Sequence, residues 1–141
     1  MWFIKLINNV VFQTVISGVL VFVIGEIAQK FFLQPLQDFK SVIGKTDHYL
    51  KFYANVIVSF AHPTEVAIKV ADALRTLSCD LEVAYKKLPS NLLFLVPSKE
   101  AITSAARSLI YLSNSVGKQG EAVRNDEQIR IIRNNLKIPE L

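Results

Sequence analysis

Side chains that commonly perform catalysis or bind metal ions are sparse in this sequence of 141 residues. Its two histidines, His48 and His62, have no second metal ligand at helical spacing. The sequence contains no C-x-x-C pair, H-E-x-x-H motif, P-loop or glycine-rich nucleotide fingerprint. A serine or cysteine nucleophile would need a histidine base, and the sequence places neither convincingly. We therefore expect no metal, no other cofactor and no enzymatic activity, and interpret the histidines as interface or turn residues.

The single cysteine, Cys79, stands in the segment L-S-C-D-L. One thiol cannot form an internal disulfide, which agrees with a reducing compartment. The segment lies on an apolar helix face, where a free cysteine behaves as a small hydrophobic residue. The pattern predicts that Cys79 packs in the core and is chemically inert.

Arginines are the remaining candidates for binding. Arg124, Arg130 and Arg133 stand near the C-terminus and could form a cationic wall that contacts an RNA backbone or a partner. Acidic residues are interspersed in the same segment, however, and favour ordinary pairing on a helix surface. Arg75, beside a hydrophobic stripe, could anchor a partner carboxylate, although packing of its stem on the helix surface is the simpler use.

The most informative element is a long apolar run near the N-terminus. Val10–Ile24 contains no charged residue, and its extension to Leu6–Ile27 includes only Glu26, near the end. A helix of about 20 residues is needed to cross the hydrocarbon core of a bilayer. Aromatic residues, which mark membrane interfaces, flank the run on both sides: Trp2, Phe3, Phe31 and Phe32. The run predicts a single membrane-spanning helix.

Two alternatives fit part of this pattern. A cleaved secretory signal would need a more basic start than Lys5, a shorter apolar core and a small-residue cleavage site, whereas the helix-like segment G-E-I-A-Q-K-F-F follows here. A buried helix of a soluble protein would explain the polar residues Gln13, Thr14 and Ser17 within the run. Length and flanks favour the membrane span over both alternatives.

Charges on the two sides of the run predict its orientation. Only Lys5 and the amino terminus precede it, whereas several lysines follow within a short distance: Lys30, Lys40, Lys45 and Lys51. Positive residues accumulate on the cytoplasmic side of a membrane helix. We therefore expect everything after residue 30 to lie in the cytoplasm.

The predicted span has two unlike faces. At 100° per residue, one broad arc carries bulky side chains suited to lipid: Phe12, Ile16, Val19, Leu20, Val23 and Ile27. The opposite arc is mostly small, and Gln13 and Ser17 flank it: Thr14, Gly18, Val21, Gly25 and Ala28. Small and polar residues allow close approach and hydrogen bonding between membrane helices. The arc with Gln13, Thr14, Ser17, Gly18, Val21 and Gly25 therefore predicts a helix interface or a pore lining, although glycine is also generally common in membrane helices.

The fold class predicted for the whole chain is all-α, with a membrane helix and its flanks in residues 1–34 and a small cytoplasmic helical domain in residues 35–141. Residues 29–44 are expected to continue or follow the membrane helix, with Pro35 allowing a bend where the chain leaves the bilayer. Asp47 is expected to cap a helix over residues 49–60, although V-I-V-S-F could also form a strand. Leu92–Val96 is expected to be a short apolar link lying against the core or the membrane.

Three further helices are expected, over residues 64–88, 98–116 and 121–137. Thr64 and Ser98 are the expected caps of the first two, and the loop Gly117–Gly120 precedes the third. The apolar stripes of these helices are expected to form the core: Val66, Val70, Leu74, Leu77, Leu81 and Leu88, then Ile102, Ala105, Ala106, Leu109, Ile110 and Leu112, then Val123, Ile129, Ile132 and Leu136.

A family resemblance follows from the order of several segments: V-F-V-I-G-E-I-A-Q-K-F-F-L-Q-P-L-Q, then F-Y-A-N-V, A-L-R-T-L-S-C-D-L, S-K-E-A-I and L-I-Y-L-S-N-S. Over residues 21–114 the chain resembles the small membrane proteins that accompany the RNA-guided ribonuclease of type VI-B CRISPR systems. The resemblance implies a ring-shaped homo-oligomeric pore in the bacterial inner membrane, with a HEPN-like helical domain in the cytoplasm. It also implies depolarisation of that membrane in antiviral defence, with the RNA-guided ribonuclease or its RNA as a partner.

The chain departs from the HEPN pattern in one respect. HEPN ribonucleases use an arginine followed four to six residues later by a histidine, whereas here both histidines precede Arg75, the first arginine. No catalytic residue of that family can be transferred to this sequence. The leading hypothesis is therefore a non-enzymatic, self-associating membrane pore, and the alternative is a helical binding module tethered to the membrane without a pore.

Overall fold

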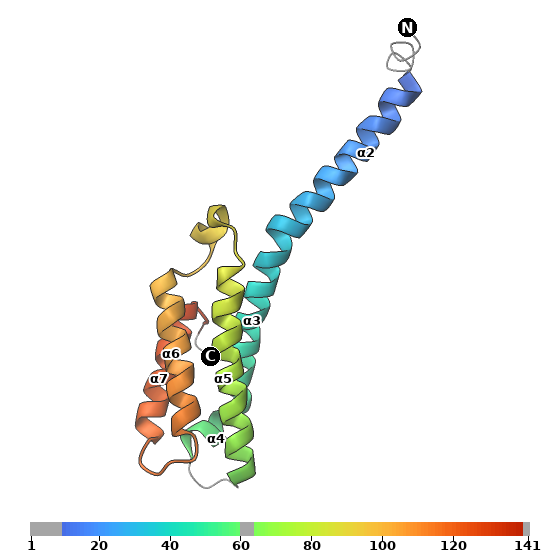
Figure 1. The fold of residues 1–141 in the computed structure, drawn as a ribbon. Helices are drawn as coiled ribbons and strands as arrows, with labels where there is room; N and C mark the ends of the chain where they lie inside the picture. The colour runs from blue at the N-terminus through green and yellow to red at the C-terminus, as the bar shows by residue number, and fades with distance from the viewer. Residues whose placement is uncertain (1–9, 60–63, 140–141) are drawn as a thin grey trace. The chain divides into compact units, whose positions relative to one another are not determined.

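The computed structural model describes residues 10–59 and 64–139, in which every regular element is a helix (Figure 1). In chain order these are α2 (Val10–Ala28), the π-helix η1 (Gln29–Leu33), α3 (Gln34–Phe52), α4 (Ala54–Val58), α5 (Thr64–Lys86), the 3-10 helix η2 (Ser90–Leu95), α6 (Lys99–Ser115) and α7 (Ala122–Leu136). The described stretches contain no strand, which confirms the all-helical prediction. The alternative strand around Val56 is wrong, since that residue lies in α4.

The chain divides between Gln34 and Pro35 into two compact units. In the N-terminal unit, none of the residues of α2 is buried. At 1.5 Å per residue its 19 residues extend over about 28 Å, close to the thickness of a hydrocarbon core. Within the described residues, one helix is long and apolar enough to cross a membrane, and its apolar window falls in this part of the chain.

A local change in hydrogen bonding follows α2. The Gln34 N–H donates to the carbonyl of Gln29, five residues earlier, which is the spacing of a π-turn. Proline has no N–H, and its ring clashes with the carbonyl four residues before it. Pro35 therefore explains why regular α-helical bonding gives way here, at the place where the sequence predicts a bend.

The C-terminal unit is a helical bundle. Helix α5 packs along α6, α6 packs along α7, and the short helix α4 contacts both α5 and α7. Helix α3 lies beside α5 (Figure 1), where the Phe39 ring meets the edge of Tyr85 at a centroid distance of 6.1 Å. The core of this bundle contains side chains from every α-helix of the unit: Phe39, Leu50, Ile57, Val70, Leu74, Leu77, Leu81, Ile102, Leu109, Leu112, Ile132 and Leu136.

Helix α6 begins with the cap that the sequence predicts. The hydroxyl oxygen of Ser98 accepts a hydrogen bond from the N–H of Ala101 at 3.3 Å. A hydrogen bond from its own backbone and one from Ser98 lower the pKa of Glu100, so the carboxylate stays ionised beside the positive end of the helix dipole. The first turn of α6 is thus fixed by its own sequence.

We predict that Ser98→Ala lowers the free energy of unfolding by about 1 kcal/mol, because an orphan N–H in the first turn loses its acceptor. Ser98→Thr is the matched control, since threonine keeps a hydroxyl that can accept the same hydrogen bond. Thermal unfolding of the full chain in detergent, followed by circular dichroism, measures both variants. Equal loss in the two variants would contradict a capping role for the hydroxyl.

Two sequence expectations around α3 and α4 are wrong. Asp47 does not cap a helix, because α3 continues past it to Phe52. Its carboxylate instead accepts a hydrogen bond from Lys51, one turn later, at 2.6 Å. Gly44 interrupts the helical pattern but does not break the helix, and the chain departs from helical geometry at Tyr53 instead. Phe52, the last residue of α3, is 69% exposed.

The apolar stripe of α5 is confirmed, whereas those of α6 and α7 are confirmed only in part. Ile110 is 38% exposed, and Val123 is 82% exposed. The inward position near the start of α7 is taken by a polar side chain, Asn125, which is buried and hydrogen-bonded. Val123 precedes Asn125 by two residues, which places the two on opposite sides of a helix.

Several expectations fall outside the described residues. These concern the N-terminal flank with Trp2, Phe3 and Lys5, and the break at residues 60–63, which includes His62. Thr64, expected as a cap after that break, is the first residue of α5.

Candidate functional site

The predicted helix interface lies entirely on α2. Its residues recur at steps of three and four, so they share one side of the helix: Thr14, Gly18, Val21 and Gly25, with Gln13 and Ser17 along the border. All six are exposed within the chain. Bulky side chains on the other side are also exposed, among them Val19 at 56% and Leu20 at 55%. The described part of the chain therefore covers neither side of this helix.

The two glycines leave open space on that side. A Cβ atom built on Gly18 or Gly25 meets no atom within 4 Å outside the helix's own local backbone. The hydroxyl of Thr14 donates to the carbonyl of Val10 at 2.8 Å, which satisfies it within the helix. The arc thus combines a self-satisfied polar group with two shallow positions at which a second helix backbone could approach closely.

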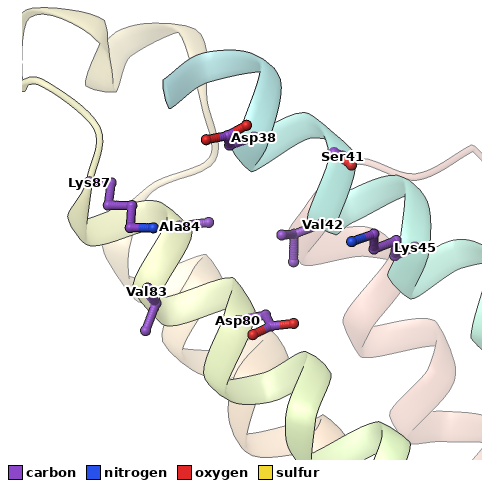
Figure 2. A pocket seen from close by; sticks show the side chains of 8 residues that line it. All are labelled: Asp38, Ser41, Val42, Lys45, Asp80, Val83, Ala84 and Lys87. Carbon is purple, nitrogen blue, oxygen red and sulfur yellow. The ribbon is translucent and has the colours of Figure 1, made fainter. Parts of the chain in front are cut away.

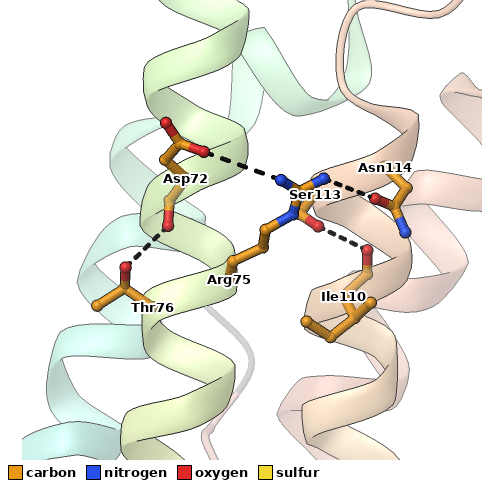
Figure 3. A network of polar contacts seen from close by, with 6 residues as sticks. All are labelled: Asp72, Arg75, Thr76, Ile110, Ser113 and Asn114. Atoms are coloured by element: carbon orange, nitrogen blue, oxygen red, sulfur yellow. Dashed lines mark hydrogen bonds and ion pairs between the residues drawn. The ribbon is translucent and has the colours of Figure 1, made fainter.

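Arg75 takes part in a polar network between α5 and α6 (Figure 3). Its guanidinium donates to the Asn114 side-chain oxygen at 3.0 Å and lies 4.0 Å from the Asp72 carboxylate. The hydroxyls of Thr76 and Ser113 donate to backbone carbonyls of their own helices, at Asp72 and Ile110. Arg75 is thus used for contacts within the chain, and its side chain remains about half exposed.

Each of the three α7 arginines lies near an acidic side chain. Arg124 is 3.6 Å from Glu121, and Arg130 is 3.4 Å from Asp126. These are pairs one helical turn apart on an exposed surface, of the kind that contributes little to stability. Arg133 points elsewhere, to Asp47 of α3 at 3.9 Å, and is largely covered. The structure therefore distributes the arginines over several surfaces and neutralises part of their charge.

Sequence reasoning missed a pocket between α3 and α5, with a volume of about 230 Å³. Figure 2 shows Asp38 and Lys87 at one end of it and Lys45 and Asp80 at the other. The acid and the base are seven residues apart on each helix, and this repeated spacing is a signal that could have revealed the pocket. Because the acid of each helix faces the base of the other, the arrangement favours the pairing of α3 with α5.

The expectation for Cys79 is wrong, since this residue is exposed rather than packed in the core. Its neighbour Ser78 takes the inward position and donates to the Ala106 carbonyl at 2.9 Å, linking α5 to α6. His48 is exposed and stacks on Phe52 at a centroid distance of 5.8 Å, in keeping with a surface role. The described residues contain no group of three or more side chains able to hold a metal ion.

Comparison with known proteins adds no assignment. No family model, curated protein or solved structure matches this chain.

Proposed function

We propose that the protein is a non-enzymatic, single-span membrane protein that self-associates through α2 to form a pore. The observation that carries this proposal is an apolar helix of membrane length that has no buried residue and bears one face of small residues. The predicted orientation places the C-terminal unit in the cytoplasm, and the resemblance to CRISPR accessory proteins suggests the bacterial inner membrane.

Exposed apolar side chains on α2 support a lipid environment. Large hydrophobic residues on all sides of the helix are more than 40% exposed: Val10, Val11, Val15, Ile16, Val19, Leu20, Val21, Phe22, Val23, Ile24 and Ile27. Removal of each from water is worth about 1.5–3 kcal/mol when complete. Insertion into a bilayer would remove all of these side chains from water together. The absence of charge from Val10 to Ile24 avoids the cost of placing ions in hydrocarbon.

Self-association follows from the second face. Lipid tails are as apolar as leucine, so membrane helices associate through close packing and polar contacts rather than through hydrophobicity. The face with Gly18 and Gly25 permits that packing, and Gln13, Thr14 and Ser17 supply polar groups at its N-terminal part. In a ring of spans the part of this arc with Gln13, Thr14, Ser17 and Gly18 would line the conduction path, and the bulky arc would face lipid.

The biological setting is proposed from the sequence resemblance alone. In antiviral defence the pore would depolarise the membrane when an RNA or protein signal reaches the C-terminal unit. An RNA-guided ribonuclease or its RNA is the proposed partner. Arg75 and the exposed α7 residues Arg124 and Arg130 are the candidate contacts, because their side chains are more than half exposed. Arg133, largely covered, is the weakest of the four candidates.

A second candidate function is a membrane-tethered adaptor without a pore. The observation that favours it is the self-contained core of the C-terminal unit, which could bind a partner without assembly of the spans. An adaptor should tolerate replacement of α2 by an unrelated apolar helix of equal length, whereas a pore should lose conduction.

The particle mass in detergent separates the two candidates. We expect light scattering, with the detergent contribution subtracted, to show a discrete oligomer with enough spans to enclose a channel. We also expect planar-bilayer recordings of this particle to show current that is lost when α2 is replaced. A monomer or dimer would contain too few helices to enclose a path and would favour the adaptor.

A further inference from the structure

The turn η2 carries an apolar surface that the bundle does not cover. Phe94 is 80% exposed and Leu95 is 54% exposed, and we call these two residues the η2 patch. Leu93 of the same turn packs against the core and holds η2 to the bundle. Scattered exposed leucines are ordinary on protein surfaces, but a phenylalanine and a leucine adjacent on a turn form a protruding apolar tip.

This tip lies at the end of the C-terminal unit where the chain enters from α2. The first turns of α3, the end of α5, η2 and the start of α6 all lie at one end of the bundle (Figure 1). Two contacts confirm the placement of these elements. Asp38 of α3 and Lys87, directly after α5, line one pocket, and Leu93 of η2 lines another with Tyr85 and Ile102.

We propose that the η2 patch docks into the interface of the membrane that α2 crosses. This inference rests on the proposed membrane span. Phe94 and Leu95 would enter the boundary between headgroups and acyl chains, as apolar side chains of interfacial segments do. The partner surface is thus a lipid bilayer, and docking would fix the distance between the bundle and the membrane.

Charge near the patch agrees with an anionic bilayer. Lys86 ends α5, Lys87 follows it, and Lys99 begins α6, so exposed lysines stand on both sides of η2 in the chain. Each lysine close to an anionic surface is attracted to it, whereas carboxylates are repelled. Among the described residues, the carboxylates that line pockets at this end of the bundle are Asp38, Glu82 and Glu100. With Lys40 included, four cations face three anions, so apolar insertion provides most of the attraction and charge adds to it.

Continuity of the chain favours this occupant over a second copy. Pro35 opens the bundle directly after the unit that contains α2, so the membrane lies within reach of this end by connectivity alone. A tethered surface binds at high effective concentration, which makes even a small apolar tip effective. If a second copy covered the η2 patch instead, its C-terminal unit would need an apolar surface complementary to Phe94 and Leu95.

Lipid quenching on the full chain in vesicles tests the proposal. Asn91, exposed on η2, is changed to cysteine in a Cys79→Ser background and labelled with an environment-sensitive fluorophore. The chain is reconstituted in phosphatidylcholine vesicles that contain roughly one quarter phosphatidylglycerol, which gives the bilayer an anionic surface. The vesicles also contain lipids that carry a doxyl group high on the acyl chain, which quenches a fluorophore at that depth. The matched control is the native chain labelled at the exposed Cys79, in the C-terminal half of α5. We expect strong quenching at residue 91 and weak quenching at residue 79.

The double variant Phe94→Ser with Leu95→Ser should abolish the difference between the two labels, since loss of two apolar side chains weakens docking about tenfold or more. Unchanged thermal unfolding would show that the bundle still folds, as expected for exposed positions. Protein that floats with vesicles after a carbonate wash but shows no quenching at residue 91 would overturn the docking and leave the span intact. Protein that does not float would overturn the span itself, and the docking with it. A label shielded from both aqueous iodide and doxyl lipid would place a second copy on the patch, and would also overturn the proposal.

Discussion

Gly18→Leu and Gly25→Leu are each expected to eliminate the discrete oligomer and its conductance while leaving the C-terminal unit folded. A leucine side chain at either position would fill the space through which a neighbouring helix backbone approaches. Association should weaken by about tenfold or more, which corresponds to about 1.4 kcal/mol or more. The particle mass by light scattering and planar-bilayer current measure the two effects.

Contacts within one chain cannot explain a loss of assembly in these variants. An added Cβ at Gly18 or Gly25 meets no atom within 4 Å outside the local backbone, so the larger residue displaces nothing within its own chain. Leucine also has a higher helix propensity than glycine, by up to about 1 kcal/mol in soluble hosts. A loss of assembly would therefore come from contacts between chains, because the change should otherwise favour the helix.

Val19→Leu and Val23→Leu are the matched controls, since both positions lie on the bulky arc that should face lipid. Both controls also introduce a leucine into the span. We expect the particle mass and the bilayer current of these two variants to equal those of the native chain. Thermal unfolding of all four variants should follow the native chain. Native oligomers and currents in both glycine variants would refute the assignment of this face. Equal losses in the valine variants would show that the whole span is sensitive to bulk.

The parts of the fold that the sequence predicts are those determined by local periodicity. The stripe from Val70 to Leu81 belongs to one uninterrupted helix, and its members are buried as the 3.6-residue repeat requires. The cap at Ser98 is likewise local, because a serine side chain and the N–H groups that it satisfies are neighbours in the chain.

Errors arise where a distant partner decides the outcome. Asp47 has the residue type of a cap, yet α3 continues through it, and its carboxylate pairs with Lys51 and with Arg133 of α7. Cys79 and Ser78 are adjacent, and only the carbonyl of Ala106 across the interface explains why the serine is the residue turned inward. Such contacts depend on the relative rotation of two packed helices, which one sequence does not reveal.

The candidate site shows the same division. The arc on α2 is predictable because helical geometry alone places Gly18 and Gly25 on one side. The ion pairs of the arginines are only partly predictable. Arg124 and Arg130 pair with acids one helical turn away, which the sequence shows. Arg133 instead pairs with Asp47 of α3, almost ninety residues away in the chain. The η2 patch is visible in the sequence as an apolar link, but its position at one end of the bundle comes from the fold.

Asn125→Ala is expected to lower the free energy of unfolding of the C-terminal unit by about 2–4 kcal/mol, the largest single-residue effect that we predict for stability. Asn125 is 2% exposed and joins three helices. Its side-chain oxygen accepts from the Ser115 hydroxyl at 2.6 Å, and its side-chain nitrogen donates to the Ile57 carbonyl at 2.7 Å. Ile57 lies in the last turn of α4, where carbonyl groups lack partners within the helix.

The cost arises from the groups left behind. Alanine removes both hydrogen bonds. The Ser115 hydroxyl can still donate to the Leu112 carbonyl at 3.1 Å, but the Ile57 carbonyl loses the Asn125 donor, and an unsatisfied buried polar group costs about 1–3 kcal/mol. Asn125→Leu separates this effect from lost volume, because leucine fills similar space without a donor or acceptor. Both variants should therefore be destabilised, and the alanine variant more strongly, since it adds a cavity.

Thermal unfolding of the full chain in detergent, followed by circular dichroism, should show a midpoint lower by roughly 10 °C or more in both variants. Asn134→Ala is the matched control, because this asparagine lies on the same helix but is exposed, and such substitutions usually stay within about 0.5 kcal/mol. A leucine variant as stable as the native chain would show that packing, and not the hydrogen bonds, holds α4 to α6 and α7. Helix α4 contacts both α5 and α7. The variants should therefore increase amide exchange more in α4 than in α5, because a lost contact between helices frees the short helix first. General loosening of the core would increase exchange in both helices alike.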